Sequence, residues 1–181
     1  MKLSERRKKF GLGLKKISLK EGSSDDSSGP QEAVTTNATR FNEKKIYQIT
    51  SNLFMSGYYS ACDINLLNAN GINHVVNLTA HKNQNLHEDK IGYSSFSLAD
   101  NSNFDLTSVL EEILSEIAKL LAKGKKILIH CKMGISRAPS IILAFMIRIQ
   151  GMTYKEAFSK LQNINPKISP NFGFLLQLQK L

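Results

Sequence analysis

The eight residues from His130 to Arg137 constrain this chain of 181 residues more than any other segment. They follow a short apolar run at 126–129 that is typical of a buried strand, and they precede a long apolar run at 141–149 that is typical of a buried helix. A turn of this length that closes onto a helix N-terminus directs successive backbone N–H groups toward one point. The sequence therefore predicts an anion site between this strand and this helix.

The two reactive side chains of the turn are Cys131 and, six positions later, Arg137. The backbone amides, the helix dipole and the guanidinium all favour the thiolate, which is the nucleophilic form of cysteine. Arg137 offers two parallel N–H donors to two phosphoryl oxygens, a geometry that lysine cannot match. These residue types predict that Cys131 attacks a phosphate monoester, while Arg137 binds the phosphate and the charge of the transition state.

The other residues of the turn have supporting roles in this hypothesis. We expect His130 to hydrogen-bond backbone and fix the shape of the loop, and Ser136 to hydrogen-bond within it. Gly134 lets the backbone approach the ligand closely. The predicted phosphate-binding turn comprises Lys132, Met133, Gly134, Ile135, Ser136 and Arg137.

Cleavage of a phosphate ester also requires a proton for the leaving oxygen, which a carboxylic acid near the turn can supply. Asp100 is the first candidate, because it follows a strand-like alternation and lies in the polar loop 99–103. Asp105 is the competitor. It directly precedes the helical pattern that begins at Leu106, and is better explained as the cap of that helix.

The stretch His130 to Arg137 resembles the signature of the cysteine-dependent protein tyrosine phosphatases. Segments 52–57, 71–79 and 169–178, together with the Asp100 loop, are similar in order to the dual-specificity branch, and the resemblance covers residues 43–181. The sequence Cys131-Lys132-Met133-Gly134 further resembles the active-site loop of the slingshot-type phosphatases. The resemblance implies a phosphatase fold, hydrolysis of phosphotyrosine, phosphoserine and phosphothreonine through a phosphocysteine intermediate, and the roles already given to Cys131, Arg137 and Asp100.

One position departs from the family pattern. The family commonly carries Ser or Thr directly after the arginine, where it hydrogen-bonds the departing thiolate, but this chain has Ala138. We therefore expect slow hydrolysis of the phosphoenzyme unless Ser136 or Ser140 compensates. The departure keeps open a phosphate-binding, pseudophosphatase-like module with slow turnover. An inositol-lipid phosphatase is a further alternative, against which the apolar Ile135 counts, since lipid phosphatases resemble this loop but carry a basic residue there.

The composition predicts a cytoplasmic or nuclear protein that needs no cofactor. There are only two cysteines, Cys62 and Cys131, so no disulfide framework is expected and a reducing compartment fits. The sequence has no apolar run of membrane-spanning length and no signal-peptide core at its start. His81 and His87 lie in a polar loop without the spacing of metal ligands, so no metal is expected.

The net charge of +9 is concentrated in the first twenty residues, which hold eight Lys and Arg against one Glu. Residues 21–39 are rich in Ser, Gly, Asp and Thr, as in a flexible linker, and we place residues 1–42 outside the catalytic domain 43–181. The basic segment 1–20 has three interpretations: a solvated arm, a patch for an anionic membrane surface or nuclear import, and a docking peptide for MAP kinases. The expected partners are phosphoprotein substrates, without specific nucleic acid; the oligomeric state stays open.

Strands alternate with helical patterns along 43–181, which predicts a single α/β domain with a mostly parallel, twisted sheet flanked by helices. Five short strands are expected, at Lys45–Ile49, Leu53–Ser56, His74–Leu78, Ser94–Leu98 and Lys126–His130. Long helices are expected at about 106–122, ending at Gly124, and at 138–150, ending at Gly151. Capping signals at Ser60 and Thr153 and the pair Ser169-Pro170 predict the starts of three further helices.

Overall fold

The structure is a computed structural model that describes residues 44–80 and 85–181. The predictions made for residues 1–42, including the kinase-docking, membrane-surface and linker interpretations, lie outside these residues, as does His81.

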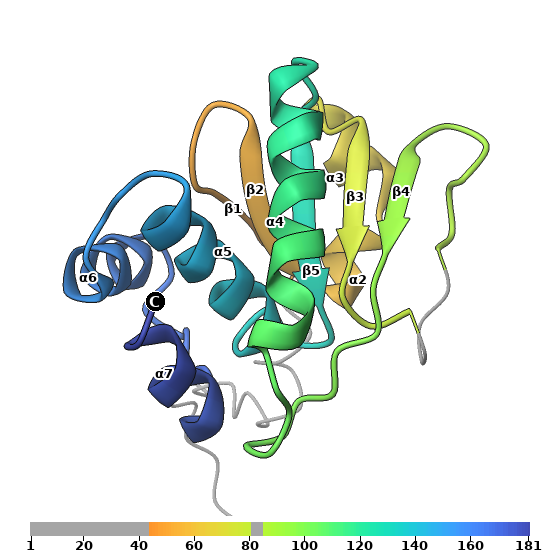
Figure 1. Cartoon of the computed structure of the whole chain (residues 1–181). Helices are drawn as coiled ribbons and strands as arrows, with labels where there is room; N and C mark the ends of the chain where they lie inside the picture. The colour runs from red at the N-terminus through yellow and green to blue at the C-terminus, as the bar shows by residue number, and fades with distance from the viewer. Residues whose placement is uncertain (1–43, 81–84) are drawn as a thin grey trace, which may run out of the picture. The chain divides into compact units, whose positions relative to one another are not determined.

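A single five-stranded sheet forms the centre of the domain, with strand order β1-β2-β5-β3-β4 (Figure 1). The edge strand β1 pairs antiparallel with β2, and all other neighbours pair parallel. The mostly parallel α/β architecture is therefore confirmed. The strands are β1 (Ile46–Gln48), β2 (Leu53–Gly57), β3 (His74–Asn77), β4 (Gly92–Ser95) and β5 (Ile127–Cys131).

Alternate residues of a strand point to opposite faces of the sheet, and in the central strands both sets are buried. Leu53, Val76 and Ile129 belong to the larger core cluster, which the long helices cover, whereas their neighbours Val75 and Leu128 belong to a second, smaller cluster. The helices are α2 (Tyr58–Ala61), α3 (Ile64–Ala69), α4 (Thr107–Ala122), α5 (Arg137–Arg148), α6 (Tyr154–Ile164) and α7 (Phe172–Leu178).

The two long helices form close to where their apolar patterns predict them. Helix α4 ends before Gly124, which adopts a φ of 71° that glycine tolerates without strain. In α5 the ten residues from Arg137 to Met146 are all buried, so this helix lies inside the domain with its N-terminus directly after the predicted phosphate-binding turn. Burial of this kind stabilises a helix more than its intrinsic propensity does.

Most boundaries differ from the prediction by one or two residues, and three differences have a clear structural context. Strand β4 begins two residues earlier, at Gly92, where it pairs with His74, and it ends at Ser95 rather than at Leu98. Ser60 caps no helix, since its hydroxyl donates to the carbonyl of Lys45, and Asp63 caps α3 instead. The last helix does not open at Pro170: Asn171 is its N-cap.

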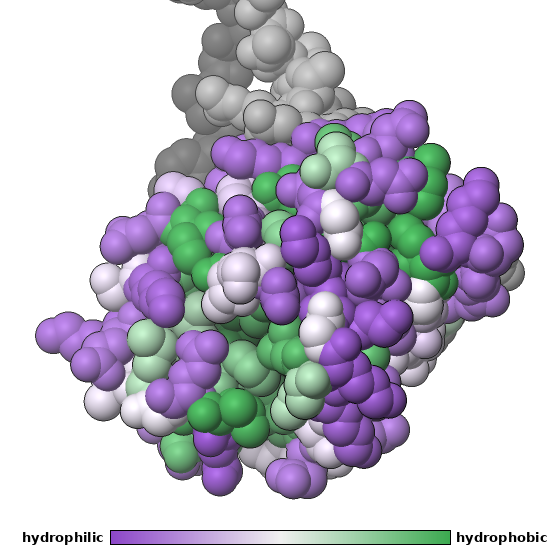
Figure 2. All heavy atoms as spheres, turned by 90° about the horizontal axis from the view of Figure 1, so that it is seen from above, coloured by the Kyte–Doolittle hydropathy of each residue, from purple (hydrophilic) through white to green (hydrophobic). Residues whose placement is uncertain are grey.

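The parallel strands all end on one side of the domain. In Figure 1 this is the lower end, where the turn after β5, the loop before α4 and helix α7 lie together. The opposite end, seen in Figure 2, is covered mainly by hydrophilic side chains with hydrophobic ones in separate groups between them. The site of interest is therefore at the carboxyl ends of the strands.

The predicted capping box of α6 is present and allows a direct test of helix capping. The Thr153 side chain accepts a hydrogen bond from the amide of Glu156, and the Glu156 carboxylate accepts from Thr153. We predict that Thr153→Ala lowers the free energy of unfolding by about 1 kcal/mol, the usual effect of losing an N-cap. Urea denaturation measures it, with the exposed Lys155→Ala as control; equal stability of the two variants would contradict the prediction.

Candidate active site

The predicted nucleophile Cys131 is the last residue of β5, and its side chain is buried. The backbone amide of Gly134 donates a hydrogen bond to its sulfur, with a nitrogen–sulfur distance of 3.2 Å. The chain therefore bends back over the sulfur within three residues. This contact is of the kind that stabilises a thiolate.

Two carbonyl groups of the turn point out toward neighbouring segments. Lys132 accepts a hydrogen bond from the amide of Tyr58 at 3.0 Å, and Ile135 accepts one from the amide of Ser169 at 2.8 Å. In a trans peptide the N–H group points opposite to the carbonyl, and no described peptide bond is cis. The amides of Met133 and Ser136 are therefore directed away from Tyr58 and Ser169, into the turn, as an anion site requires.

Gly134 has a structural role in packing the turn on β2, in addition to the expected close approach of a ligand. Its φ of 70° favours glycine, and a Cβ atom there would lie 2.8 Å from the backbone nitrogen of Gly57. A Cβ on Gly57 would in turn meet the backbone of Met133 at 3.2 Å. The two glycines allow the turn to pack backbone against backbone on the end of β2.

His130 is an uncharged structural residue at neutral pH. It is 3% exposed, and its Nδ1 atom lies 3.4 Å from the carbonyl oxygen of Cys131. Burial lowers the pKa of His130 to about 4, and the neighbouring charge of Arg137 acts in the same direction. This agrees with the expectation that His130 supports the loop rather than acting as a base.

Arg137, the predicted phosphate binder, is the first residue of α5 and is 7% exposed. Its Nη1 donates to the carbonyl of Leu98 at 3.3 Å, which orients the guanidinium. Its Nε lies 3.4 Å from Oδ2 of Asp100 but makes no hydrogen bond within the described residues. An anion that binds beside this buried N–H group would give it a hydrogen-bond acceptor, which is a favourable interaction.

Asp100, the predicted general acid, lies next to the turn. Its Oδ1 accepts hydrogen bonds from Oγ of Ser136 at 2.7 Å and from Nδ2 of Asn171 at 3.0 Å, while its Oδ2 faces Arg137. The competitor, Asp105, accepts from the amides of Thr107 and Ser108 at the start of α4. The hydrogen bond from the Thr107 hydroxyl at 2.6 Å is the main cause that holds the pKa of Asp105 below its usual range, and the two amides act in the same direction. That carboxylate is therefore occupied at the start of α4, although the N-cap position itself is Leu106.

Ser136 and Ser140, the two hydroxyl groups expected to compensate for Ala138, are both occupied. Ser136 donates to Asp100, and Ser140 donates to the carbonyl of Ser136 at 2.8 Å. Among the described residues, the hydrogen bond to the Cys131 sulfur comes from the backbone amide of Gly134. Neither serine compensates for Ala138 in this arrangement.

Helix α7 contributes site residues that the sequence reasoning missed. Asn171 contacts both Asp100 and Ser136, and Gln177 binds the backbone of the acid loop at Phe104 and Leu106. The sequence Ser169-Pro170-Asn171 held a signal for the capping role, because asparagine is a strongly preferred N-cap residue. Its second function, toward a residue 71 positions away, has no local signal.

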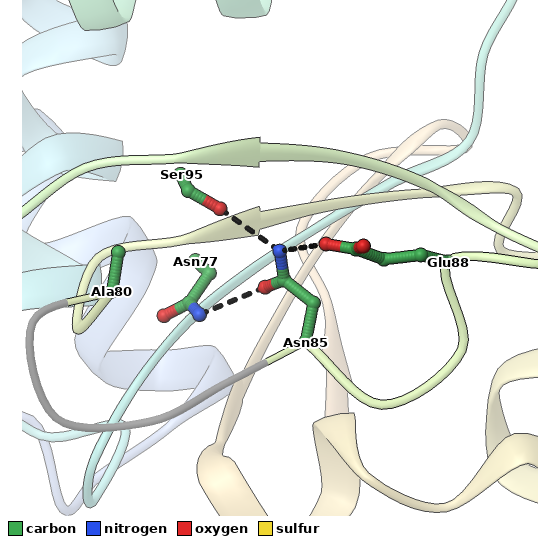
Figure 3. Close-up of a pocket in the computed structure, with 5 residues that line it drawn as sticks. All are labelled: Asn77, Ala80, Asn85, Glu88 and Ser95. Carbon is green, nitrogen blue, oxygen red and sulfur yellow. Dashed lines mark hydrogen bonds between the residues drawn. The ribbon is translucent and has the colours of Figure 1, made fainter.

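A polar hollow with a volume of about 350 Å³ lies at the ends of β3 and β4 (Figure 3). Asn77 donates to Asn85, whose Nδ2 in turn donates to Glu88 at 2.7 Å and Ser95 at 3.1 Å. These polar groups bond one another across the hollow. They join the polar loop after Asn85 to the sheet.

Three further properties concern the described part of the chain. Between residues 44–80 and 85–181, no cluster of three or more His, Cys, Asp or Glu side chains has an arrangement that could hold a metal ion. Across the same ranges, every helix is too short or too polar to cross a lipid bilayer. The second cysteine, Cys62, is a free thiol whose pKa is raised by burial.

The family model for the catalytic domain of dual specificity phosphatases matches residues 53–181. The chain therefore belongs to the dual specificity phosphatase family, and the resemblance read from the sequence is confirmed. It is similar to dual specificity protein phosphatase PHS1 of Arabidopsis thaliana, with 34% identity over 145 residues, covering 77% of this chain and 16% of that protein. It is also similar to protein phosphatase Slingshot homolog 3 of Rattus norvegicus, with 29% identity over 132 residues, covering 73% of this chain and 20% of that protein.

Among solved structures, the chain is similar to the human tyrosine phosphatase-like serine/threonine/tyrosine-interacting protein. The TM-score is 0.70 and the identity 28%, over 76% of this chain and 95% of that one. The chain spans only between 16% and 35% of the length of the curated relatives that it matches. The likeness to those relatives therefore concerns their phosphatase domain.

The buried His130 makes stability depend on pH. Its pKa is about 4 in the folded chain and 6.5 in the unfolded one, so between these values the unfolded chain binds the extra proton. Its contribution is present above pH 6.5 and is lost as the pH falls toward 4. We predict that, from about pH 6.5 to about pH 4.5, the wild type loses about 2 kcal/mol more unfolding free energy than His130→Gln.

Urea denaturation at several pH values measures this difference. The carboxylates and the partly buried His74 titrate in both proteins, so they cancel in the comparison. Parallel pH curves for the two proteins would show that His130 is not held neutral by burial.

Proposed function

We propose that this chain is a dual-specificity protein phosphatase that hydrolyses phosphotyrosine, phosphoserine and phosphothreonine through a phosphocysteine intermediate. The observation that carries the proposal is the closed turn: an amide bonds the Cys131 sulfur, the guanidinium of Arg137 starts the following helix, and Asp100 lies 3.4 Å from that guanidinium. Membership of the dual specificity phosphatase family supports the same reaction.

In the first step the Cys131 thiolate attacks phosphorus, a sulfur–phosphorus bond forms, and the bond from phosphorus to the ester oxygen breaks. Asp100 gives its proton to that oxygen, which leaves as an alcohol or phenol. In the second step Asp100, now a carboxylate, takes a proton from a water molecule that attacks phosphorus. The sulfur–phosphorus bond breaks, and inorganic phosphate and the thiolate are released. Arg137 and the inward amides bind the phosphoryl oxygens throughout.

The proposed substrates are phosphoproteins. The turn carries one lysine, Lys132, which is exposed, and the half-buried, apolar Ile135 stands where a lipid phosphatase has a second basic residue. Relatives whose names state a protein phosphatase support this choice over an inositol lipid. The basic segment 1–20 remains a proposed docking site for a MAP kinase or an anionic surface.

A phosphate-binding module with slow turnover is the second candidate. It is favoured by Ala138 together with the engagement of Ser136 and Ser140 elsewhere, which leaves the departing thiolate without a hydroxyl partner. One solved structure of similar fold is described as phosphatase-like. The retained Cys131, Arg137 and Asp100 favour the enzyme.

The decisive test is hydrolysis of phenyl phosphate by the wild type, Cys131→Ser and Asp100→Ala. We expect no turnover above background for Cys131→Ser, since serine at this position is a poor nucleophile. Asp100→Ala should lower kcat/KM by about 10²- to 10⁴-fold, because the group that gives its proton to the leaving oxygen is gone. A wild type no faster than Cys131→Ser would contradict the enzyme, and an unaffected Asp100→Ala would contradict the assigned acid.

The role of position 138 is tested by pre-steady-state kinetics. We predict that the wild type gives a burst of phenol followed by a slow steady rate, because phosphoenzyme hydrolysis limits turnover. Ala138→Ser should raise the steady rate about tenfold and shrink the burst, since a hydrogen bond to a charged group contributes about 1.5–3 kcal/mol. If neither the burst nor the steady rate changes, thiolate departure is not the slow step. The buried Ala144→Ser, farther along the same helix, is the control for a hydroxyl in α5.

A further inference from the structure

Building on the proposed function, we propose that Asn171 is a positioning residue that holds the general acid Asp100 from helix α7. Its Nδ2 donates to Oδ1 of Asp100 at 3.0 Å, and its backbone amide donates to Oγ of Ser136 at 3.1 Å. Its own Oδ1 accepts the amide of Phe174 and so caps α7. One residue thereby connects the acid loop, the phosphate-binding turn and a helix.

The two oxygens of Asp100 have different surroundings. Oδ1 accepts hydrogen bonds from Ser136 and Asn171, which occupy both of its lone pairs. This arrangement favours a proton on Oδ2, whose lone pairs are not used by Ser136 or Asn171 and which lies 3.4 Å from Nε of Arg137. Asn171 and Ser136 thus select the oxygen that faces the phosphate-binding guanidinium as the one that gives the proton to the leaving group.

Asp100 needs such support because its loop has no regular structure between β4 and α4, and its side chain is 34% exposed. Helix α7 holds the rest of that loop too. Gln177 accepts the amide of Leu106 at 2.7 Å and donates to the carbonyl of Phe104 at 3.0 Å. The Phe104 ring packs edge-on against the buried Phe174.

The contact between α7 and the loop leaves no space at Gly173. A Cβ atom there would overlap the carbonyl oxygen of Ser102, far inside van der Waals contact. The acid loop therefore rests on the first turn of α7, and Asn171 at the start of that turn has a defined position relative to Asp100.

The test separates capping of α7 from the contact with Asp100. Asn171→Ser keeps a good N-cap side chain but lacks the amide that reaches Asp100. We measure kcat/KM, which reports the steps up to phosphoenzyme formation, for aryl phosphates whose leaving phenols range from weakly to strongly acidic. A misplaced acid matters most for a poor leaving group. We expect a loss of about tenfold with phenyl phosphate and of less than about twofold with 2,4-dinitrophenyl phosphate.

Two comparisons make the result specific. Thr153→Ala removes a helix cap of α6, away from the site, and should change kcat/KM by the same small factor for every substrate. Asn171→Asp keeps a capping side chain but replaces the donating amide with a carboxylate, which cannot donate to Oδ1 of Asp100. It should therefore show the same dependence on the leaving group as Asn171→Ser. Inhibition by inorganic phosphate in Asn171→Ser should stay within about twofold of the wild type.

An equal loss across all leaving groups in Asn171→Ser would overturn the proposal, as would an equal loss across them in Asn171→Asp. Both results would reduce Asn171 to a helix cap while the wild type remained an active phosphatase. A wild type without activity above Cys131→Ser would instead remove the proposed function, and the role of Asn171 with it.

Discussion

The site depends on where the carbonyl groups of the turn 132–136 find their partners. A planar peptide presents its carbonyl and its N–H on opposite sides, so outward hydrogen bonds to Tyr58 and Ser169 direct the corresponding amides inward. The turn follows the carboxyl end of the central strand β5. There the carbonyls of Lys132 and Ile135 each have a backbone donor, which avoids the free-energy cost of a polar backbone group without a partner. The concave set of donors is thus a consequence of satisfying acceptors elsewhere. A ligand is not needed to form it.

The same constraint explains the glycines and the start of α5. Backbone contact between Gly57 and Gly134 brings the turn close enough for the bond to Tyr58. Ser136 occupies the N-cap position of α5, yet its side chain makes no cap and serves Asp100 and Asn171 instead. The first amides of a buried helix are therefore left for an anion, and the helix dipole favours negative charge at this end.

Sequence reasoning located what is locally encoded. The apolar runs of β3 and β5, the burial of α5, the glycine after α4 and the cap at Thr153 each follow from a few neighbouring residues. It failed where distant segments compete for the same group. Ser60 donates to Lys45 rather than capping α3, and the N-cap of α7 is Asn171, whose side chain also contacts the distant Asp100. Residue types pointed to Asp100, but its partners lie 36 and 71 positions away.

The arrangement of hydroxyl groups divides the work between the two chemical steps unequally. Ser136, the hydroxyl of the turn, serves the carboxylate that the first step needs as an acid, and Ser140 serves the backbone. Ala138 then offers the sulfur nothing when it must leave phosphorus. Such a site has a well-supported proton donor for forming the phosphoenzyme and a poorly supported leaving group for breaking it down. An enzyme and a slow phosphate-binding module would bind and attack the phosphate through the same turn. They would differ in the rate at which the Cys131 thiolate leaves phosphorus in the second step.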